Sequence, residues 1–197
     1  MVRVIAGAAK GRQLHSVPGE GTRPISDRVK ESLFSILGGD TEDSLWLDLF
    51  AGTGSVGIEA LSRGARHVVF IDKAHQAAAT VRRNLELTAF QERAQVIRGD
   101  ALRYLRQAEP DPPFDYIYVA PPQYRELWAE ALMALDERPL LAPDGLIIVQ
   151  IHPKEFGPVL LQRLELASER RYGSTLLLFY QLLEPAAEEG DPDAASS

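Results

Sequence analysis

The stretch that decides the fold is Leu-Asp-Leu-Phe-Ala-Gly-Thr-Gly-Ser-Val-Gly at residues 47–57. An apolar run at residues 45–47 leads into it, and a pattern with helical spacing follows. The glycines Gly52, Gly54 and Gly57 therefore stand between a predicted strand and a predicted helix, the setting that this motif requires. Glycine lets the backbone turn tightly and a ligand approach closely, and the helix directs its free N–H groups toward that ligand. The stretch predicts a site for an adenosine-containing cofactor.

Short apolar runs alternate with helical stretches along the rest of the chain. The runs are residues 45–50, 67–71, 94–98, 115–119 and 145–151, and the helical stretches are residues 55–63, 75–88, 101–107 and 124–141. This alternation predicts an α/β fold, with a parallel sheet covered by helices on both faces. Beyond it we expect a helix at residues 156–164 and a last strand at 174–181 that closes one edge of the sheet.

The N-terminal segment has a different pattern. Residues 2–6 and 13–17 flank a short turn and predict a β-hairpin. Ser26 or Asp27 can cap a helix whose apolar residues recur with a period near 3.6 and which ends at Gly38.

Three regions follow from these patterns. Residues 1–37 form a hairpin and helix that extend the fold, and residues 38–183 form the cofactor-binding domain. Residues 184–197 are acidic, rich in small residues and poor in apolar side chains, which predicts a disordered tail.

Composition limits the class of protein. A chain of 197 residues with 45% hydrophobic residues can bury a core of about one domain. The absence of cysteine excludes disulfides, thiolate zinc sites and cysteine nucleophiles, and the four histidines lack metal-ligand spacing, so we expect no metal. No apolar run approaches the ~18 residues of a membrane span. We expect a cytoplasmic protein without a membrane partner.

The charge is unevenly distributed. The net charge is −7, yet residues 1–35 carry six basic and three acidic side chains, a local charge of +3. A basic segment on an acidic body can form a patch that faces phosphates. On charge alone, a solvated surface is the interpretation we favour.

Three carboxylates bear on which cofactor is bound. Asp72 stands twenty residues after Gly52 at the end of the second apolar run, where it can accept both ribose hydroxyls of either a dinucleotide or S-adenosylmethionine. Asp100 ends the third run, where an adenine amino group would need an acceptor. Asp48 precedes the glycines and can meet an ammonium group directly or through water. Each acid alone has a plain alternative as a helix cap or loop residue, but together they favour S-adenosylmethionine.

The chain resembles the RsmD-type 16S rRNA guanine-N2 methyltransferases over roughly residues 2–182. The resemblance depends on Val-Ile-Ala-Gly-x-x-Lys-Gly-Arg at residues 4–12, on Gly-Thr-Arg-Pro-Ile-Ser-Asp-Arg-Val-Lys-Glu-Ser-Leu-Phe at 21–34, and on residues 47–65. The second segment is the most specific, since many methyltransferases share the glycine loop and few carry that prelude.

The resemblance implies a class I methyltransferase (Rossmann-like) fold, a doubly wound seven-stranded sheet whose last strand is antiparallel. It also implies S-adenosyl-L-methionine as cofactor and 16S rRNA or a small-subunit intermediate as partner, and we expect a monomer. The cofactor-binding residues that it implies are Asp48, Phe50, Ala51, Gly52, Thr53, Gly54, Ser55, Asp72, Lys73, Asp100 and Ala101. The expected RNA contacts are Arg3, Lys10, Arg12, Arg23, Ser26 and Arg28, and the expected catalytic segment is Ala120, Pro121, Pro122, Gln123 and Tyr124.

That catalytic segment departs from the family pattern. The fourth motif is normally Asp or Asn, then Pro-Pro, then Tyr or Phe, whereas here Ala120 and Gln123 flank the two prolines. Backbone carbonyls and the Gln123 amide can replace the missing acceptor, which favours a working enzyme. The alternatives are a non-catalytic protein that binds RNA and uses the cofactor as a structural ligand and, more distantly, an NAD-dependent oxidoreductase.

Overall fold

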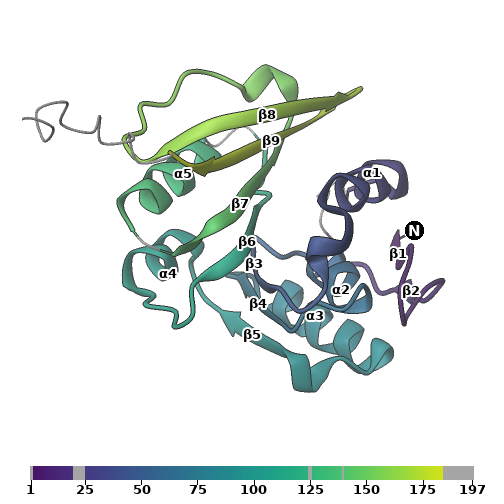
Figure 1. The fold of residues 1–197 in the computed structure, drawn as a ribbon. Coiled ribbons are helices and arrows are strands. Elements are labelled where there is room, and N and C mark those ends of the chain that lie inside the picture. The colour runs from purple at the N-terminus through teal and green to yellow at the C-terminus, as the bar shows by residue number, and fades with distance from the viewer. Residues whose placement is uncertain (1, 20–24, 124–125, 139, 184–197) are drawn as a thin grey trace, which may run out of the picture.

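A seven-stranded sheet forms the centre of the molecule (Figure 1). The computed structural model describes residues 2–19, 25–123, 126–138 and 140–183. The strands are β3 (Leu45–Leu49), β4 (His67–Asp72), β5 (Ala94–Arg98), β6 (Phe114–Val119), β7 (Leu141–Ile151), β8 (Leu164–Tyr172) and β9 (Thr175–Leu182). They lie in the order β5-β4-β3-β6-β7-β9-β8, and β9 is antiparallel to both of its neighbours. The predicted α/β sheet with an antiparallel last strand is confirmed.

Helices cover both faces of this sheet, as the alternating pattern predicted. On one face lie α1 (Asp27–Leu37), α2 (Ser55–Ser62) and α3 (His75–Thr88), and on the other lie α4 (Ala101–Gln107) and α5 (Leu127–Glu137) (Figure 1). Short 3-10 turns occur at η1 (Gly38–Thr41), η2 (Gln91–Arg93) and η3 (Pro153–Glu155).

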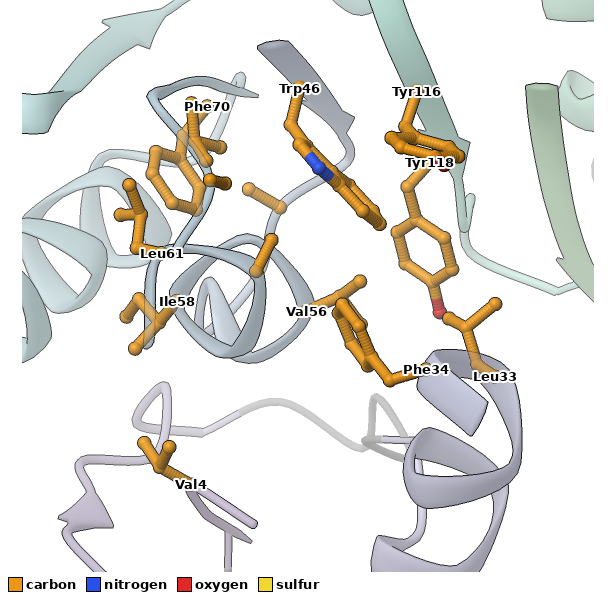
Figure 2. Close-up of a cluster of buried hydrophobic side chains, with 14 of the residues drawn as sticks. Val4, Leu33, Phe34, Trp46, Val56, Ile58, Leu61, Phe70, Tyr116 and Tyr118 are labelled. Carbon is orange, nitrogen blue, oxygen red and sulfur yellow. The ribbon is translucent and has the colours of Figure 1, made fainter. Parts of the chain in front are cut away.

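Alternation along the strands produces two separate cores. In β3, Trp46 points to the face of α1–α3, and Leu47 and Leu49 point to the face of α4 and α5. Figure 2 shows the first core, where Trp46 meets residues of α1, α2 and β6. The Trp46 ring lies between Phe34 and Tyr116, with ring centroids 5.5 and 4.7 Å away.

The N-terminal hairpin is confirmed but has shorter strands than predicted. β1 (Val2–Arg3) and β2 (Gln13–Leu14) pair antiparallel, and the segment between them packs on the end of α2. Gly7 lies so close that a Cβ there would be 1.8 Å from the carbonyl oxygen of Ser62, and its φ is +78°. The N-terminal segment therefore shares its core with the sheet and its helices.

The structure corrects the predictions near the C-terminal end. The helix expected at residues 156–164 is wrong. The 3-10 turn η3 ends at Glu155, residues 156–163 are irregular chain, and β8, a strand that the pattern missed, begins at Leu164. Pro158 disfavours helical backbone at the preceding residue, Gly157, and glycine itself has a low helix propensity. Similarly, α5 ends at Glu137 instead of continuing to residue 141, since Pro139 disfavours helix at Arg138.

A buried carboxylate holds the start of β8. Asp136 on α5 is 7% exposed and accepts hydrogen bonds of 2.8 Å from the backbone N–H groups of Gln162, Arg163 and Leu164. We expect Asp136→Ala to lower the free energy of unfolding by about 3 kcal/mol, because three N–H groups lose their acceptor. Urea denaturation measures this loss. Asp136→Asn keeps the oxygen that serves two of the three donors, so a loss as large as that of alanine would contradict the assignment.

Candidate active site

The carboxyl ends of four parallel strands lie along one edge of the sheet and carry the residues that the sequence singled out. The glycine loop follows β3, Asp72 ends β4, Asp100 follows β5 and Ala120 follows β6. β3 pairs with β4 on one side and with β6 on the other, so the chain's winding reverses here. Such a switch point is where open α/β sheets bind ligands. The predicted cofactor residues and residues 120–123 are therefore brought to one edge.

The glycine loop has left-handed backbone at three positions, since Phe50, Gly52 and Gly54 have φ values of 60°, 55° and 74°. The glycines serve different purposes. A Cβ on Gly57 would lie 2.4 Å from the Phe70 ring, so this glycine lets α2 pack against β4. A Cβ on Gly52 would meet open space, with one backbone oxygen at 3.9 Å. Gly52 thus leaves room beside the loop for a ligand.

Asp72 supports the loop from the neighbouring strand. One carboxylate oxygen accepts a hydrogen bond of 2.9 Å from the N–H of Gly52, and the other accepts one of 2.8 Å from the N–H of Ala74. A carboxylate oxygen can accept two bonds, so Asp72 can hold the loop and still accept ribose hydroxyls.

Asp48 lies beneath the loop and is 2% exposed. Its carboxylate accepts a hydrogen bond of 3.1 Å from the N–H of Gly57. The pKa of Asp48 is raised to about 8, chiefly because the carboxyl group is buried; the Gly57 hydrogen bond acts in the opposite direction, and the nearby Asp72 charge contributes to the rise. A cationic group placed beside Asp48 would favour its ionised form.

The raised pKa of Asp48 predicts a pH-dependent stability. Between its ordinary pKa of 3.8 and about 8, the folded chain holds a proton that the unfolded chain has released. The free energy of unfolding should therefore fall as pH rises through this window, by up to about 1.4 kcal/mol per pH unit. Asp48→Asn should remove this contribution and stabilise the protein most at the alkaline end. Urea denaturation across the window measures both slopes, and equal slopes would contradict the assignment.

Asp100 has a structural role in addition to its predicted one. It is the N-cap of α4, and its carboxylate accepts a hydrogen bond of 2.9 Å from the N–H of Arg103. Its side chain is exposed at the sheet edge, next to the buried Ala101. Lys73 is also exposed. The cap orients the Asp100 carboxylate without burying it.

The proline segment follows β6 directly beside the glycine loop. The N–H of Ala120 donates to the carbonyl of Leu49 at 3.5 Å, which joins the ends of β6 and β3. Ala120 and Pro121 are half-buried, while Pro122 and Gln123 are exposed. Tyr124 lies outside the described residues. The segment therefore lies next to the loop that is predicted to hold the cofactor, and part of it is open to solvent.

The predicted RNA contacts lie on the N-terminal segment. Lys10, Arg12 and Arg28 are exposed, and the 60% exposed Arg3 pairs with Asp27 at 2.7 Å. A cavity of about 160 Å³ opens between Arg3 and Lys10. These cations occupy the surface of the hairpin and of α1.

The two remaining predicted RNA contacts are Ser26 and Arg23. Ser26 is the N-cap of α1, since its hydroxyl accepts a hydrogen bond of 3.3 Å from the N–H of Val29. The Ser26 hydroxyl therefore already accepts a hydrogen bond from its own helix, although the residue is exposed to solvent. Arg23 lies outside the described residues.

Two buried polar residues escaped the sequence prediction. Asn84 on α3 and Glu59 on α2 are both 0% exposed and bind the N-terminal segment. Each is a polar residue on a helix surface that is otherwise largely apolar, which is the signal that could have identified them.

The described residues also limit other functions. Among them, no group of three His, Cys, Asp or Glu side chains is placed to hold a metal ion. None of the helices in the described ranges combines the length and apolar character needed to span a bilayer.

Comparison with known proteins gives consistent matches over nearly the whole chain. The family described as "Conserved hypothetical protein 95" matches residues 2–181. The Bacillus subtilis protein YlbH is 41% identical over 183 residues, covering 91% of this chain and 98% of that protein. The Escherichia coli protein "Ribosomal RNA small subunit methyltransferase D" is 32% identical over 98% of this chain and 94% of its own. The solved structure of Escherichia coli yhhF superposes with a TM-score of 0.81 at 32% identity, covering 92% of this chain and 97% of that chain.

Proposed function

Since this chain belongs to the RsmD/YlbH family, described as "Conserved hypothetical protein 95", we propose that it methylates the exocyclic N2 amine of a guanine in 16S rRNA, with S-adenosylmethionine as the methyl donor. The family resemblance drawn from the sequence motifs is confirmed. The observation that carries the proposal is the adjacency of the glycine loop and the proline segment, joined by the Ala120–Leu49 hydrogen bond. A donor site and an acceptor site for the methyl group then lie side by side.

The residues of the loop suit this cofactor. The space beside Gly52 would admit the cofactor's backbone, and Asp72 would accept the ribose hydroxyls. The buried Asp48 would face the ammonium group through an ionised carboxylate. Asp100 would accept from the adenine amine, an acceptor for which a dinucleotide site has no general need. Family membership and this set of acids favour the methyl donor over NAD.

The proline segment suits an amine acceptor. A guanine N2 amine is a poor nucleophile because its lone pair is delocalised into the ring. S-adenosylmethionine supplies an electrophilic methyl group on its sulfonium. The chain's task is to hold the amine in line with that methyl group and to accept its N–H hydrogens. The backbone carbonyls of Ala120 and Pro121 and the Gln123 amide would perform this, with the prolines limiting the movement of the backbone.

A transfer assay tests the proposed function. We expect tritium to pass from labelled S-adenosylmethionine to small-subunit RNA from cells that lack its guanine-N2 methyl group, and nuclease digestion should release labelled N2-methylguanosine. RNA that already carries the methyl group is the matched control and should remain unlabelled. Tight binding of S-adenosylhomocysteine without any transfer to RNA or to small-subunit particles would overturn the enzyme proposal.

A second candidate function rests on the methyl side chain of Ala120, which offers no acceptor. In this alternative the chain binds RNA and cofactor without turnover. Ala120→Asp then separates the two. The non-catalytic alternative expects activity in this variant and none in the wild-type protein. The enzyme proposal expects measurable activity in the wild-type protein as well, because losing one positioned acceptor costs only about 10²- to 10³-fold in rate.

A further inference from the structure

One side chain connects the N-terminal hairpin to the glycine loop. The carboxamide of Asn84 accepts a hydrogen bond of 2.7 Å from the N–H of His15 and donates one of 3.1 Å to the carbonyl of the same residue. Its NH₂ group also donates at 2.9 Å to the carbonyl of Thr53, between Gly52 and Gly54. Asn84 therefore contacts both the hairpin and the loop predicted to hold the cofactor.

The orientation of this side chain is determined by its partners. A flipped amide would place its oxygen against the two carbonyls of His15 and Thr53 and its NH₂ against a backbone N–H, so only one orientation satisfies all three bonds. Asn84 is 0% exposed, so water cannot replace these partners. A movement of the hairpin and a movement of the loop carbonyl must therefore occur together or break a buried hydrogen bond.

The rest of the hairpin is attached elsewhere. Ile5 and Ala6 bind Glu59, and Ala8 and Ala9 bind Ser62, all on α2 and away from the loop carbonyl. These bonds dock the segment on the body of the protein. Among the described residues, Asn84 is the one side chain whose hydrogen bonds join the hairpin and residues 51–54 directly.

We propose that Asn84 is a positioning residue that couples occupancy of the cofactor site to the conformation of the RNA-facing hairpin. This inference rests on the proposed function, because it assigns the loop to S-adenosylmethionine and the exposed Lys10 and Arg12 to RNA. Coupling between two ligands is reciprocal, so each should increase the affinity of the protein for the other by the same factor.

Hydrogen exchange on the full-length protein tests the first half of the inference. The N–H groups of Val4 and Gly11 bond across the hairpin, at 3.0 Å to Arg12 and 2.9 Å to Val4, and report its opening. S-adenosylhomocysteine should slow their exchange at least about fivefold in the wild-type protein. Unchanged exchange at saturating ligand would overturn the inference and leave the proposed function intact. If the ligand does not bind at all, the proposed function fails, and the inference fails with it.

Substitution tests the role of Asn84 itself. Asn84→Ala should weaken S-adenosylhomocysteine binding about tenfold and remove the slowing at Val4 and Gly11. Thr88→Val is the matched control, because Thr88 is buried on the same helix and its hydroxyl donates to the carbonyls of Asn84 and Leu85 within α3. We expect wild-type ligand affinity and wild-type slowing in this control. An alanine variant that keeps both would overturn the inference.

RNA affinity gives the second half. In the wild-type protein, S-adenosylhomocysteine should tighten binding of 16S rRNA lacking its guanine-N2 methyl group at least about fivefold, and Asn84→Ala should reduce this factor to about one. If Asn84 were merely structural, the alanine variant would bind RNA more weakly by the same factor with and without S-adenosylhomocysteine. The tightening by the ligand would then stay as in the wild-type protein, and that result would overturn the coupling.

Discussion

Replacing Gly52 by asparagine should weaken S-adenosylhomocysteine binding at least about 100-fold while the protein remains folded. The φ of Gly52 is +55°, and asparagine is among the few other residues that adopt this left-handed backbone at low cost. A Cβ at this position would have only the Phe50 carbonyl oxygen within 4 Å, at 3.9 Å, so the new side chain begins in open space. That space is the proposed location of the cofactor. Calorimetric titration measures the affinity, and a thermal unfolding transition confirms the fold.

Gly57→Ala is the matched control in the same motif. Its Cβ would lie 2.4 Å from the Phe70 ring and 2.8 Å from a Val68 methyl group, both across the interface between α2 and β4. Such overpacking should lower the free energy of unfolding by about 1–3 kcal/mol, so the main effect falls on stability. If Gly52→Asn binds S-adenosylhomocysteine as tightly as the wild type, the ligand does not occupy this space.

Removing the Glu59 side chain should destabilise the protein by about 3–5 kcal/mol. Glu59 is 0% exposed and accepts hydrogen bonds from the N–H groups of Ile5 and Ala6 at 2.7 and 2.9 Å. It also pairs with Lys30 at 3.4 Å and with Arg63 at 2.9 Å. Glu59→Ala would leave two backbone donors and a buried cation without this partner. For a chain of this size the expected loss in Tm is on the order of 10 °C.

Lys30 provides the compensating variant. Its side chain is 1% exposed, and burial lowers its pKa although the Glu59 charge acts in the opposite direction. Replacing both charges, as in Glu59→Leu with Lys30→Met, should recover part of the stability, because no buried cation is then left unpaired, although the N–H groups of Ile5 and Ala6 still lack their acceptor. Urea denaturation of the two single variants and the double variant completes the cycle. Strictly additive losses would show that Glu59 and Lys30 do not interact.

The sequence predicted the cofactor edge of the sheet well because local signals coincide there. The helices at residues 75–88 and 101–107 and the strand at 94–98 have the predicted bounds, and the glycine turn between strand and helix is confirmed. The residue assignments at this edge stay predictions, although the structure brings the described ones together. Asp100 shows why a motif alone is ambiguous, since the same carboxylate both caps α4 and faces the edge.

The failures occur where non-local contacts decide the structure. The sequence predicted a helix at residues 156–164, yet three backbone N–H groups at residues 162–164 donate hydrogen bonds to Asp136, far away in sequence. Strand β8 owes its position to pairing with β9 at the sheet edge. Most residues of β8 are exposed to solvent, so the alternating apolar pattern that identifies a strand is weak there.

By itself, the sequence determined the α/β class, the glycine turn, the family and the position of the carboxylates at the strand ends, since each depends on residues close together along the chain or on a motif. Only the tertiary structure decided how these parts act on one another. It buried Asp48 and so raised its pKa, placed Glu59 of α2 against the hairpin and against Lys30 of α1, and let Asn84 join the hairpin to the glycine loop. The physical reason is that burial and long-range hydrogen bonds depend on which distant segments pack together, and no local pattern contains that information.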